Sequence, residues 1–191
     1  MQTLIIYAHP NTNGHCSNIL GEVENRLKET GKDYEVLDLY KIKYDPILHE
    51  NEHYTAGNKH ISEQNKEFQN KIKDADKLIF IYPVWWGTMP AILKGFIDRV
   101  LVPGFAYRFS KFGIPQGFLK DKKAVVFMTT GGNRFLYLLI GNRPKRLMKT
   151  DILSFVGIKS RVFMLDNAKK FDNKKKSRIK RMVKEGIFYL F

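Results

Sequence analysis

The sequence predicts an α/β protein built on a doubly wound, five-stranded parallel sheet with helices on both faces. Short apolar runs rich in β-branched and aromatic residues recur along the 191 residues, and segments with helical periodicity separate them. This alternation is typical of a parallel sheet covered by helices. Five strands and five helices suit the strand order 2-1-3-4-5 and leave no room for a second domain, so we expect one domain over residues 1–191.

Strands and helices alternate along the whole chain. The predicted strands are the apolar runs at residues 3–8, 34–39, 77–82, 124–129 and 161–165. The predicted helices are residues 17–29, 62–74, 90–102, a shorter segment around 135–148, and 174–191. The first helix carries apolar residues at helical spacing, and Gly31 stands where a helix stop is expected. Pro90 suits the first turn of the third helix.

The positive charge of the chain is concentrated in its second half. The chain has 33 Lys and Arg against 19 Asp and Glu, and residues 101–191 hold 21 of these cations and 5 of these anions. The densest part is residues 169–184, where Asp172 is the only acidic residue. Such a segment attracts nucleic acid, an anionic membrane, a protein partner or a phosphorylated cofactor. No aromatic interleaving or nucleic-acid motif accompanies it, so we favour a solvated face of a basic helix over residues 169–191.

The composition argues against a membrane-spanning or disulfide-stabilised chain. No apolar run approaches the ~20 residues that a membrane-spanning helix needs, and no basic stretch precedes the short apolar start of the chain. The single cysteine, Cys16, cannot form a disulfide within the chain or a zinc site made of cysteines. We therefore expect a cytoplasmic protein.

Three loops with unusual composition follow the first, third and fourth predicted strands. They are residues 9–18, 83–89 and 129–137. In open α/β sheets the ligand lies beyond the carboxyl ends of the strands, at the point where the strand order reverses. These three loops meet at that point, so we expect them to form the ligand site together.

The first loop is rich in hydroxyl and amide side chains and leads directly into a helix. A helix N-terminus offers free N–H groups and a partial positive charge, which together hold a phosphate, with His9, Ser17 and Asn18 as further donors. The alternative is ordinary helix capping by Ser17 or Thr12. The loop is neither GxGxxG nor GxxxxGK[ST], so it does not indicate a dinucleotide fold or a P-loop.

The second loop places both tryptophans of the chain side by side. Trp85 and Trp86 stand between Pro83 and Pro90, and Gly87 follows them. Flat aromatic surface at the end of a strand suits a flat conjugated ligand, although one of the two indoles is equally able to pack into the core. The third loop reads Thr-Thr-Gly-Gly at residues 129–132, and its glycine N–H groups are open to a ligand's carbonyl groups.

Together these loops resemble the NAD(P)H:quinone oxidoreductases, a family of flavodoxin-like flavoproteins. The family also contains bacterial modulators of drug activity and ancillary proteins of potassium-efflux systems. The resemblance is carried by LIIYAHPNTNGHCSN, YPVWWGTMPAILKGFIDRVLVPGFAY and GFLKDKKAVVFMTTGG, which fall within residues 1–137. The middle stretch is the most specific. The resemblance implies a flavodoxin-like fold and a bound flavin.

The resemblance also implies roles for particular residues. The flavin phosphate would be held by His9, Ser17 and Asn18. The isoalloxazine ring would be lined by Pro83, Val84, Trp85, Trp86 and Gly87, with its carbonyl edge bonded by Thr129, Thr130, Gly131 and Gly132. The substrate pocket would contain Trp86, Tyr107 and Phe109, the last two near the flavin of a partner subunit. A homodimer is therefore the expected active unit.

Two residues, one at the end of the third loop and one after it, are expected to act in catalysis. Tyr137 falls where the family has a tyrosine close to the flavin, which assists charge delocalisation during hydride transfer. Better-known quinone reductases have a histidine six residues later, whereas this chain has Arg143. Arginine stays cationic, so Arg143 can stabilise an anionic reduced flavin or quinone oxyanion but cannot relay a proton.

The function implied is flavin-dependent reduction of quinones or related aromatic acceptors by NAD(P)H. Hydride would pass to the flavin and then to the acceptor in a ping-pong reaction, with both substrates using the same place. The short chain favours FMN over FAD. The alternative is a flavin-binding regulatory subunit or electron carrier, such as the ancillary protein of a transport system. A role in binding nucleic acid is the weakest candidate.

Two other motifs are weighed and set aside. Residues 49–53, His-Glu-Asn-Glu-His, match the HExxH pattern of zinc proteases, but the segment that follows offers little apolar surface to bury, so we predict a polar surface loop and no metal. Low-molecular-weight phosphatases need an arginine six residues past their cysteine, and here Glu22 stands at that distance from Cys16. Cys16 is therefore expected to be a partly buried filler.

Overall fold

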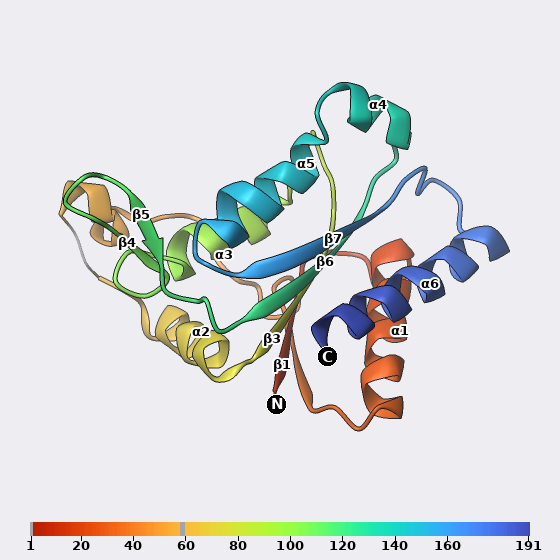
Figure 1. Cartoon of the computed structure of the whole chain (residues 1–191), viewed down its shortest axis with the longest axis horizontal. Helices are drawn as coiled ribbons and strands as arrows, with labels where there is room; N and C mark the ends of the chain where they lie inside the picture. Colours follow the sequence, from red (N-terminus) through yellow and green to blue (C-terminus); the bar gives the residue numbers. More distant parts are fainter. Residues whose placement is uncertain (1, 58–59) are drawn as a thin grey trace.

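A twisted sheet forms the centre of the molecule (Figure 1), and the computed structural model describes residues 2–57 and 60–191. The strands of this sheet are β1 (Thr3–Tyr7), β2 (Tyr34–Asp38), β3 (Lys77–Pro83), β6 (Lys123–Thr129) and β7 (Lys159–Leu165). They are parallel throughout and lie in the order β2-β1-β3-β6-β7. Counting these strands along the chain gives 2-1-3-4-5, so the predicted fold class and strand order are confirmed.

Helices cover both faces of the sheet because strand side chains alternate between two apolar clusters. One cluster lies under α1 (His15–Glu29) and α6 (Asn173–Leu190). The other lies under α2 (Glu63–Asp74), α3 (Ala91–Val100) and the segment Leu147–Ser154, which follows α5 (Arg143–Arg146). Along β1, for example, Ile5 belongs to the first cluster and Ile6 to the second, and both are fully buried.

Local capping determines where the helices begin and end. Ser62 accepts a hydrogen bond from the N–H of Asn65 at the start of α2, and Asp172 accepts one from Lys175 at the start of α6. At the end of α1, Gly31 takes a left-handed conformation with φ 61°, and Lys32 N–H donates to the carbonyl of Leu27. The predicted helix stop at Gly31 is thus confirmed.

The segment predicted as one short helix around residues 135–148 is broken in the structure. It contains α4 (Arg134–Leu139), α5 (Arg143–Arg146) and a π-helical segment, Leu147–Ser154. The break lies at Gly141 and Asn142, whose φ values of 73° and 49° are left-handed and end a right-handed helix. A small hairpin of β4 (Tyr107–Phe109) and β5 (Pro115–Gly117) was not predicted, because its strands are too short to show a periodicity.

The HENEH segment forms two turns of 3-10 helix, Glu50–Glu52 and Tyr54–Ala56, rather than an α-helix. Its histidines have separate partners, because His49 Nε2 lies 2.6 Å from Asp45 Oδ2 and His53 Nε2 lies 2.7 Å from Thr55 Oγ1. Within the described residues no group of three or more His, Cys, Asp and Glu gathers as a metal site. Residues 58 and 59 of the predicted surface loop lie outside the described residues.

A buried ion pair fastens this segment to α3. The Nε of Arg99 donates to Glu52 Oε2 at 2.7 Å and its Nη2 donates to Glu52 Oε1 at 2.9 Å, and both residues are 7% exposed. The Nη1 of Arg99 also lies 3.3 Å from Asp45 Oδ2. Burying an ionic group is tolerated where it is paired and hydrogen-bonded, as it is here.

Across the described residues, no helix is both long enough and apolar enough to cross a membrane.

Candidate functional site

A cavity of about 250 Å³ lies at the carboxyl ends of β1, β3, β6 and β7. This is the edge at which the three unusual loops were expected to meet. The cavity is lined by His9, Asn11, Gly14, His15, Cys16, Pro83, Val84, Trp85, Thr129, Thr130, Gly131 and Ala168. All three loops contribute to it, and the start of the segment after β7 closes the fourth side.

The N-terminus of α1 forms one end of the cavity. The first N–H groups of an α-helix have no acceptor within the helix, and two of the residues that carry them, His15 and Cys16, line the cavity. The side chains of Ser17 and Asn18 do not line it. The N–H of Gly14 donates to Ser17 Oγ at 2.8 Å, and the Ser17 hydroxyl and Asn18 Nδ2 donate to the Gly14 carbonyl at 2.9 and 2.7 Å.

The loop after β3 contributes the aromatic wall. The ring of Trp85 lies 6.0 Å from the ring of His9, centroid to centroid, and both residues line the cavity. The Nδ1 of His9 accepts a hydrogen bond from the N–H of Asn11 at 2.9 Å, which holds the imidazole in place. Trp85 is 41% exposed, so one part of its indole is available to a ligand.

Trp86 lies outside the cavity, at the tip of a tight turn. Trp85 and Thr88 exchange two backbone hydrogen bonds of 2.9 and 3.0 Å, and the two residues between them, Trp86 and Gly87, have φ values of 51° and 77°. Positive φ costs glycine little but is rare for a bulky residue, and such strain gathers at functional sites. The indole of Trp86 is fully exposed, so neither tryptophan packs into the core.

The Thr-Thr-Gly-Gly loop forms the opposite wall. The hydroxyl of Thr130 donates to the Tyr137 hydroxyl at 2.8 Å and accepts from the N–H of Gly132 at 3.2 Å. Tyr137 is therefore held beside this loop, although neither Tyr137 nor Gly132 lines the cavity. The side chain of Thr129 lies 3.4 Å from the Sγ of Cys16, which joins this wall to α1.

Cys16 belongs to the cavity wall and is fully buried. Its burial raises the pKa of the thiol to about 12, although the hydrogen bond with Thr129 opposes this shift. The thiol is therefore protonated and a poor nucleophile at neutral pH. Sequence reasoning had treated Cys16 only as a filler and did not include Asn11, Gly14, His15 or Ala168 in the site. Ala168 follows the carboxyl end of β7, and that position was the signal available for it.

Three of the predicted site residues lie away from the cavity in the single chain. Tyr107 is buried against the ring of Phe155, with the ring centroids 4.8 Å apart, and burial raises the pKa of its phenol. Phe109 is 56% exposed on the β4–β5 hairpin. Arg143 is exposed at the start of α5, beyond the break that follows α4.

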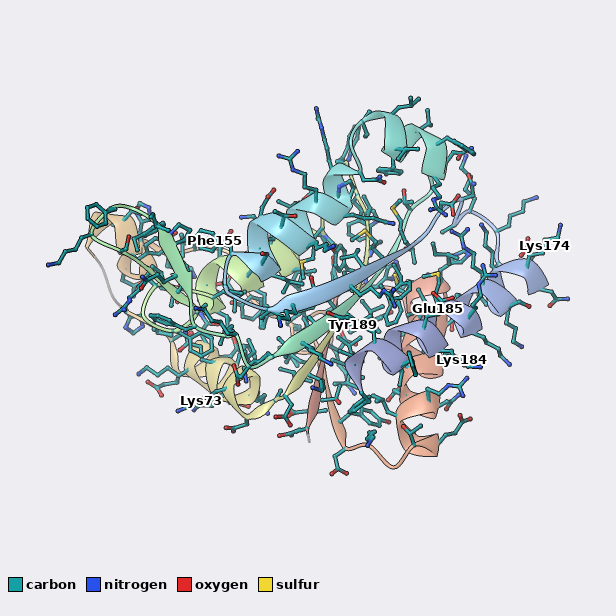
Figure 2. The ribbon with its side chains drawn as sticks, in the orientation of Figure 1. Lys73, Phe155, Lys174, Lys184, Glu185 and Tyr189 are labelled. Carbon is teal, nitrogen blue, oxygen red and sulfur yellow. The ribbon has the colours of Figure 1, made fainter. Side chains whose placement is uncertain are left out.

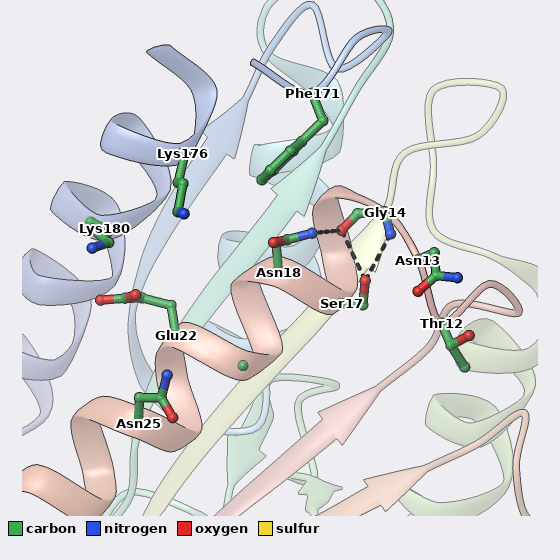
Figure 3. Close-up of a pocket in the computed structure, with 11 residues that line it drawn as sticks. Thr12, Asn13, Gly14, Ser17, Asn18, Glu22, Asn25, Phe171, Lys176 and Lys180 are labelled. Atoms are coloured by element: carbon green, nitrogen blue, oxygen red, sulfur yellow. Dashed lines mark hydrogen bonds between the residues drawn. The ribbon is translucent and has the colours of Figure 1, made fainter. Parts of the chain in front are cut away.

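A larger pocket of about 690 Å³ adjoins the cavity between α1 and α6 (Figure 3). It is lined by Thr12, Asn13, Gly14, Ser17, Asn18, Gly21, Glu22, Asn25, Phe171, Lys176 and Lys180. Gly14 lines both spaces, so the pocket continues from the helix N-terminus of the cavity. Lys176 and Lys180 extend from α6 toward α1, and the ring of Phe171 lies above the start of α1.

Comparison with known proteins places this arrangement in a family. A family described as having a flavodoxin-like fold matches residues 1–185. An uncharacterized NAD(P)H oxidoreductase of Haemophilus influenzae is 40% identical over 134 residues, which cover 70% of this chain and 66% of that protein. The ribosyldihydronicotinamide dehydrogenase [quinone] of Rattus norvegicus is 33% identical over 157 residues, which cover 73% and 68%. The matches thus span about two thirds of the length of these relatives.

A solved structure agrees with these relationships over nearly the whole chain. The NAD(P)H:quinone oxidoreductase from Methanothermobacter marburgensis superposes with a TM-score of 0.85 at 30% sequence identity. The superposition covers 97% of this chain and 95% of that one. Since the family matches all but the last residues and the observed strand order is the one expected for it, the chain belongs to the family of flavodoxin-like fold proteins.

Proposed function

We propose that the protein is a flavin-dependent NAD(P)H oxidoreductase that reduces quinones or related aromatic acceptors. The observation that carries this proposal is the cavity at the carboxyl edge of the sheet, which has free helix N–H groups at one end and the Trp85 indole in its wall. The names of the relatives, NAD(P)H oxidoreductase and quinone dehydrogenase, support the same class of reaction.

The residues around the cavity fit a flavin nucleotide. A phosphate would lie at the start of α1, where the N–H groups of His15 and Cys16 have no helical acceptor and the helix dipole favours an anion. The ring would lie against Trp85, with the backbone of Thr130 and Gly131 at its polar edge. Bound there, the flavin supplies two-electron chemistry between a nicotinamide donor and an acceptor.

Ser17 and Asn18 have a different role in this proposal from the one that the resemblance implies. Their side chains bond the Gly14 carbonyl and the Gly14 N–H, so they hold the first turn of α1 in shape. His9 remains a candidate phosphate or ring contact, because it lines the cavity beside Trp85. The protein thus offers the phosphate mainly backbone donors, which are rigid and need no rotamer ordering.

Tyr137 and Arg143 are proposed to act at the open side of the cavity. The hydrogen bond from Thr130 orients the Tyr137 phenol toward the Thr-Thr-Gly-Gly loop, where it can stabilise negative charge on a bound ring. Arg143 follows α4 after the Gly141–Asn142 break and is exposed at the start of α5, and we propose that its side chain turns toward an oxyanion in the cavity. Its guanidinium stays charged, so its contribution is electrostatic rather than proton transfer.

A homodimer is proposed to complete the acceptor pocket. Trp86 is fully exposed, and Phe109 and Phe112 on the β4–β5 hairpin are 56% and 89% exposed. Exposed aromatic groups of this size are typical of binding surfaces. A second copy that covers them would bring Tyr107 and Phe109 toward its own cofactor, which is the arrangement that the resemblance implies. A cytoplasmic location and ping-pong kinetics remain predictions.

The cofactor is proposed to be FMN, and the adjoining pocket gives a specific reason to test FAD. The pocket of about 690 Å³ continues from Gly14 and offers Lys176 and Lys180 for a second phosphate and Phe171 for a flat base (Figure 3). Chromatography of the flavin released from the purified protein decides between the two. If FAD is bound, Lys180→Gln weakens FAD binding and leaves FMN binding unchanged.

The decisive experiment combines a spectrum with turnover. The purified protein should show flavin absorption bands, or acquire them with FMN or FAD at micromolar concentration, and should oxidise NADPH or NADH with menadione faster than free flavin does. A protein that binds flavin but shows no turnover above free flavin is the regulatory subunit or electron carrier. A colourless protein that takes up neither flavin contradicts both proposals.

A further inference from the structure

A second recessed surface lies on the other flank of α6, beside the edge strand β7. It is a pocket of about 370 Å³, and Arg134, Lys145, Val162, Phe163, Met164, Arg178, Arg181, Met182 and Glu185 line it. Three helices bring four cationic side chains to this one place: α4 supplies Arg134, α5 supplies Lys145, and α6 supplies Arg178 and Arg181, while β7 contributes uncharged residues. β7 is the last strand of the sheet, so one row of its backbone groups has no strand partner.

The cations of this pocket are incompletely neutralised. Arg178 is paired with Asp166, and its Nη2 also donates to the Met164 carbonyl at 3.2 Å. Among the described residues, the other three cations, Arg134, Lys145 and Arg181, have no carboxylate oxygen within 4.0 Å. Glu185 is the one acidic residue that lines the pocket. The pocket therefore keeps a net positive charge.

Lys145 shows the electrostatic consequence of this arrangement. Burial lowers the pKa of its ammonium group, and the charges of Arg134 and Arg178 lower it further, while Asp166 opposes the shift. The surroundings of Lys145 thus destabilise the charged form of its ammonium group. A bound anion would remove this cost, because it supplies the opposite charge that the protein does not.

We propose that this cationic pocket binds a phosphate group. Guanidinium groups from two sides match the oxygens of a phosphate, and Lys145 adds a point charge between them. A contiguous pocket of about 470 Å³, which shares Arg178 and Arg181 and adds Lys174 and Ser177, has room for a second phosphate or an attached group. Figure 2 shows Lys174 at the start of α6 and Glu185 nearer its end, and these residues line the second and the first of the two pockets.

Two sources can supply this phosphate. One is the 2′-phosphate of NADPH, and that assignment rests on the proposed function. The other is a free phosphorylated ligand, which does not depend on it. Arg134, which lines this pocket, stands three residues after Gly131, which lines the cavity proposed for the flavin, and Asp166 accepts a hydrogen bond from the N–H of Arg134 at 3.4 Å. Either ligand would therefore lie next to the cofactor site.

The test is a calorimetric titration of the full chain with inorganic pyrophosphate, with and without saturating FMN, at about 50 mM salt so that screening is limited. We expect saturable binding that weakens about tenfold in Arg181→Gln and about a hundredfold in the double variant Arg134→Gln/Arg181→Gln, since each removes one charge-assisted hydrogen bond. The control is Lys184→Gln, which removes the same charge from α6 but lines none of the pockets described above (Figure 2).

The outcomes distinguish binding in this pocket from general attraction of an anion to the positively charged surface. Absence of pyrophosphate binding overturns the proposal, and so does equal weakening by Lys184→Gln and Arg181→Gln. If NADPH is the source, Arg181→Gln raises the KM for NADPH about tenfold and leaves the KM for NADH unchanged. If both KM values are unchanged while pyrophosphate binding is lost, the ligand is a free phosphate compound. Pyrophosphate binding without any reductase activity supports this site and contradicts the proposed function.

Discussion

Two regions of the molecule bury charged side chains, and they differ in whether those charges are neutralised by an oppositely charged partner. In the first, Arg99 is 7% exposed and is bonded twice to Glu52, which is equally buried. In the second, the cationic pocket beside β7, Arg178 is paired with Asp166, whereas burial and then two neighbouring cations lower the pKa of Lys145. The charges of the first region neutralise each other, whereas the second region has more cations than carboxylates to pair with them.

The difference separates a structural ion pair from a binding site. A buried charge with a bonded partner contributes to the folded state only while both members remain, because either one alone is costly to bury. Uncompensated cations do not stabilise the fold, and their arrangement is explained by something that binds to them. The cavity that we propose for the flavin is a third case, since Lys and Arg are absent from its lining and the donors at its helix end are backbone groups.

The largest expected effect is the loss of the buried ion pair. Arg99→Ala leaves Glu52 buried without a partner, so the free energy of unfolding should fall by about 3–5 kcal/mol, measured by urea denaturation. Replacing both members, as in Arg99→Met with Glu52→Leu, should restore most of this loss. Asp45→Asn is the matched control, and its effect should be smaller because the Asp45 side chain is 44% exposed, against 7% for Arg99. A loss below about 1 kcal/mol in Arg99→Ala would contradict the interpretation.

The next effect concerns the aromatic wall of the flavin cavity. Trp85→Ala should raise the Kd for FMN about 10-fold to 100-fold, since stacking on an aromatic side chain contributes about 1–3 kcal/mol per ring. Trp86→Ala removes the neighbouring indole, which lies outside the cavity, and should leave the Kd within about twofold. Fluorescence titration of FMN measures both. Equal losses in the two variants would place both indoles on the ring and revise the description of the turn.

A smaller effect is expected at Lys145. Lys145→Gln removes a cation that faces Arg134 and Arg178, so stability at about pH 7 should stay the same or rise by less than about 1 kcal/mol. Because the folded-state pKa is lowered, the cost of charged Lys145 is fully present below that pKa and is lost as the pH rises from it to the ordinary lysine pKa of the unfolded chain. The variant and the wild type should therefore converge at about pH 10. A destabilised variant at neutral pH would indicate that Lys145 is already neutralised.

The smallest effect is expected at Cys16. Since burial raises the pKa of its thiol to about 12, the folded protein should react with a thiol reagent at about pH 8 only as fast as it unfolds. The protonated thiol is the stable form in the fold, so its contribution to stability is present below the ordinary thiol pKa and is lost as the pH rises toward 12. Rapid labelling of the native protein would show that the cavity wall opens.

Much of the fold was predictable from the sequence for a local reason. Each strand of the main sheet contains a short apolar run, and each long helix has an apolar stripe, so the elements and their order follow from patterns within a few residues. The site was predictable to the level of loops, because parallel strands end at the same edge. It was not predictable to the level of side chains. Ser17 bonds both backbone groups of Gly14 as a cap, and its role as a phosphate ligand stays a prediction, since both uses need the same residue at the same place.

By itself, the sequence determined the parallel sheet, its helical layers and the edge at which the three loops meet, because these depend on hydrophobic periodicity along the chain. Only the tertiary structure decided which charges are neutralised. Glu52 and Arg99 are 47 residues apart, and Arg134 reaches the same pocket as Arg181 from another element. Coulomb energy depends on distance in space and on burial, and neither quantity can be inferred from residues that are neighbours in the sequence.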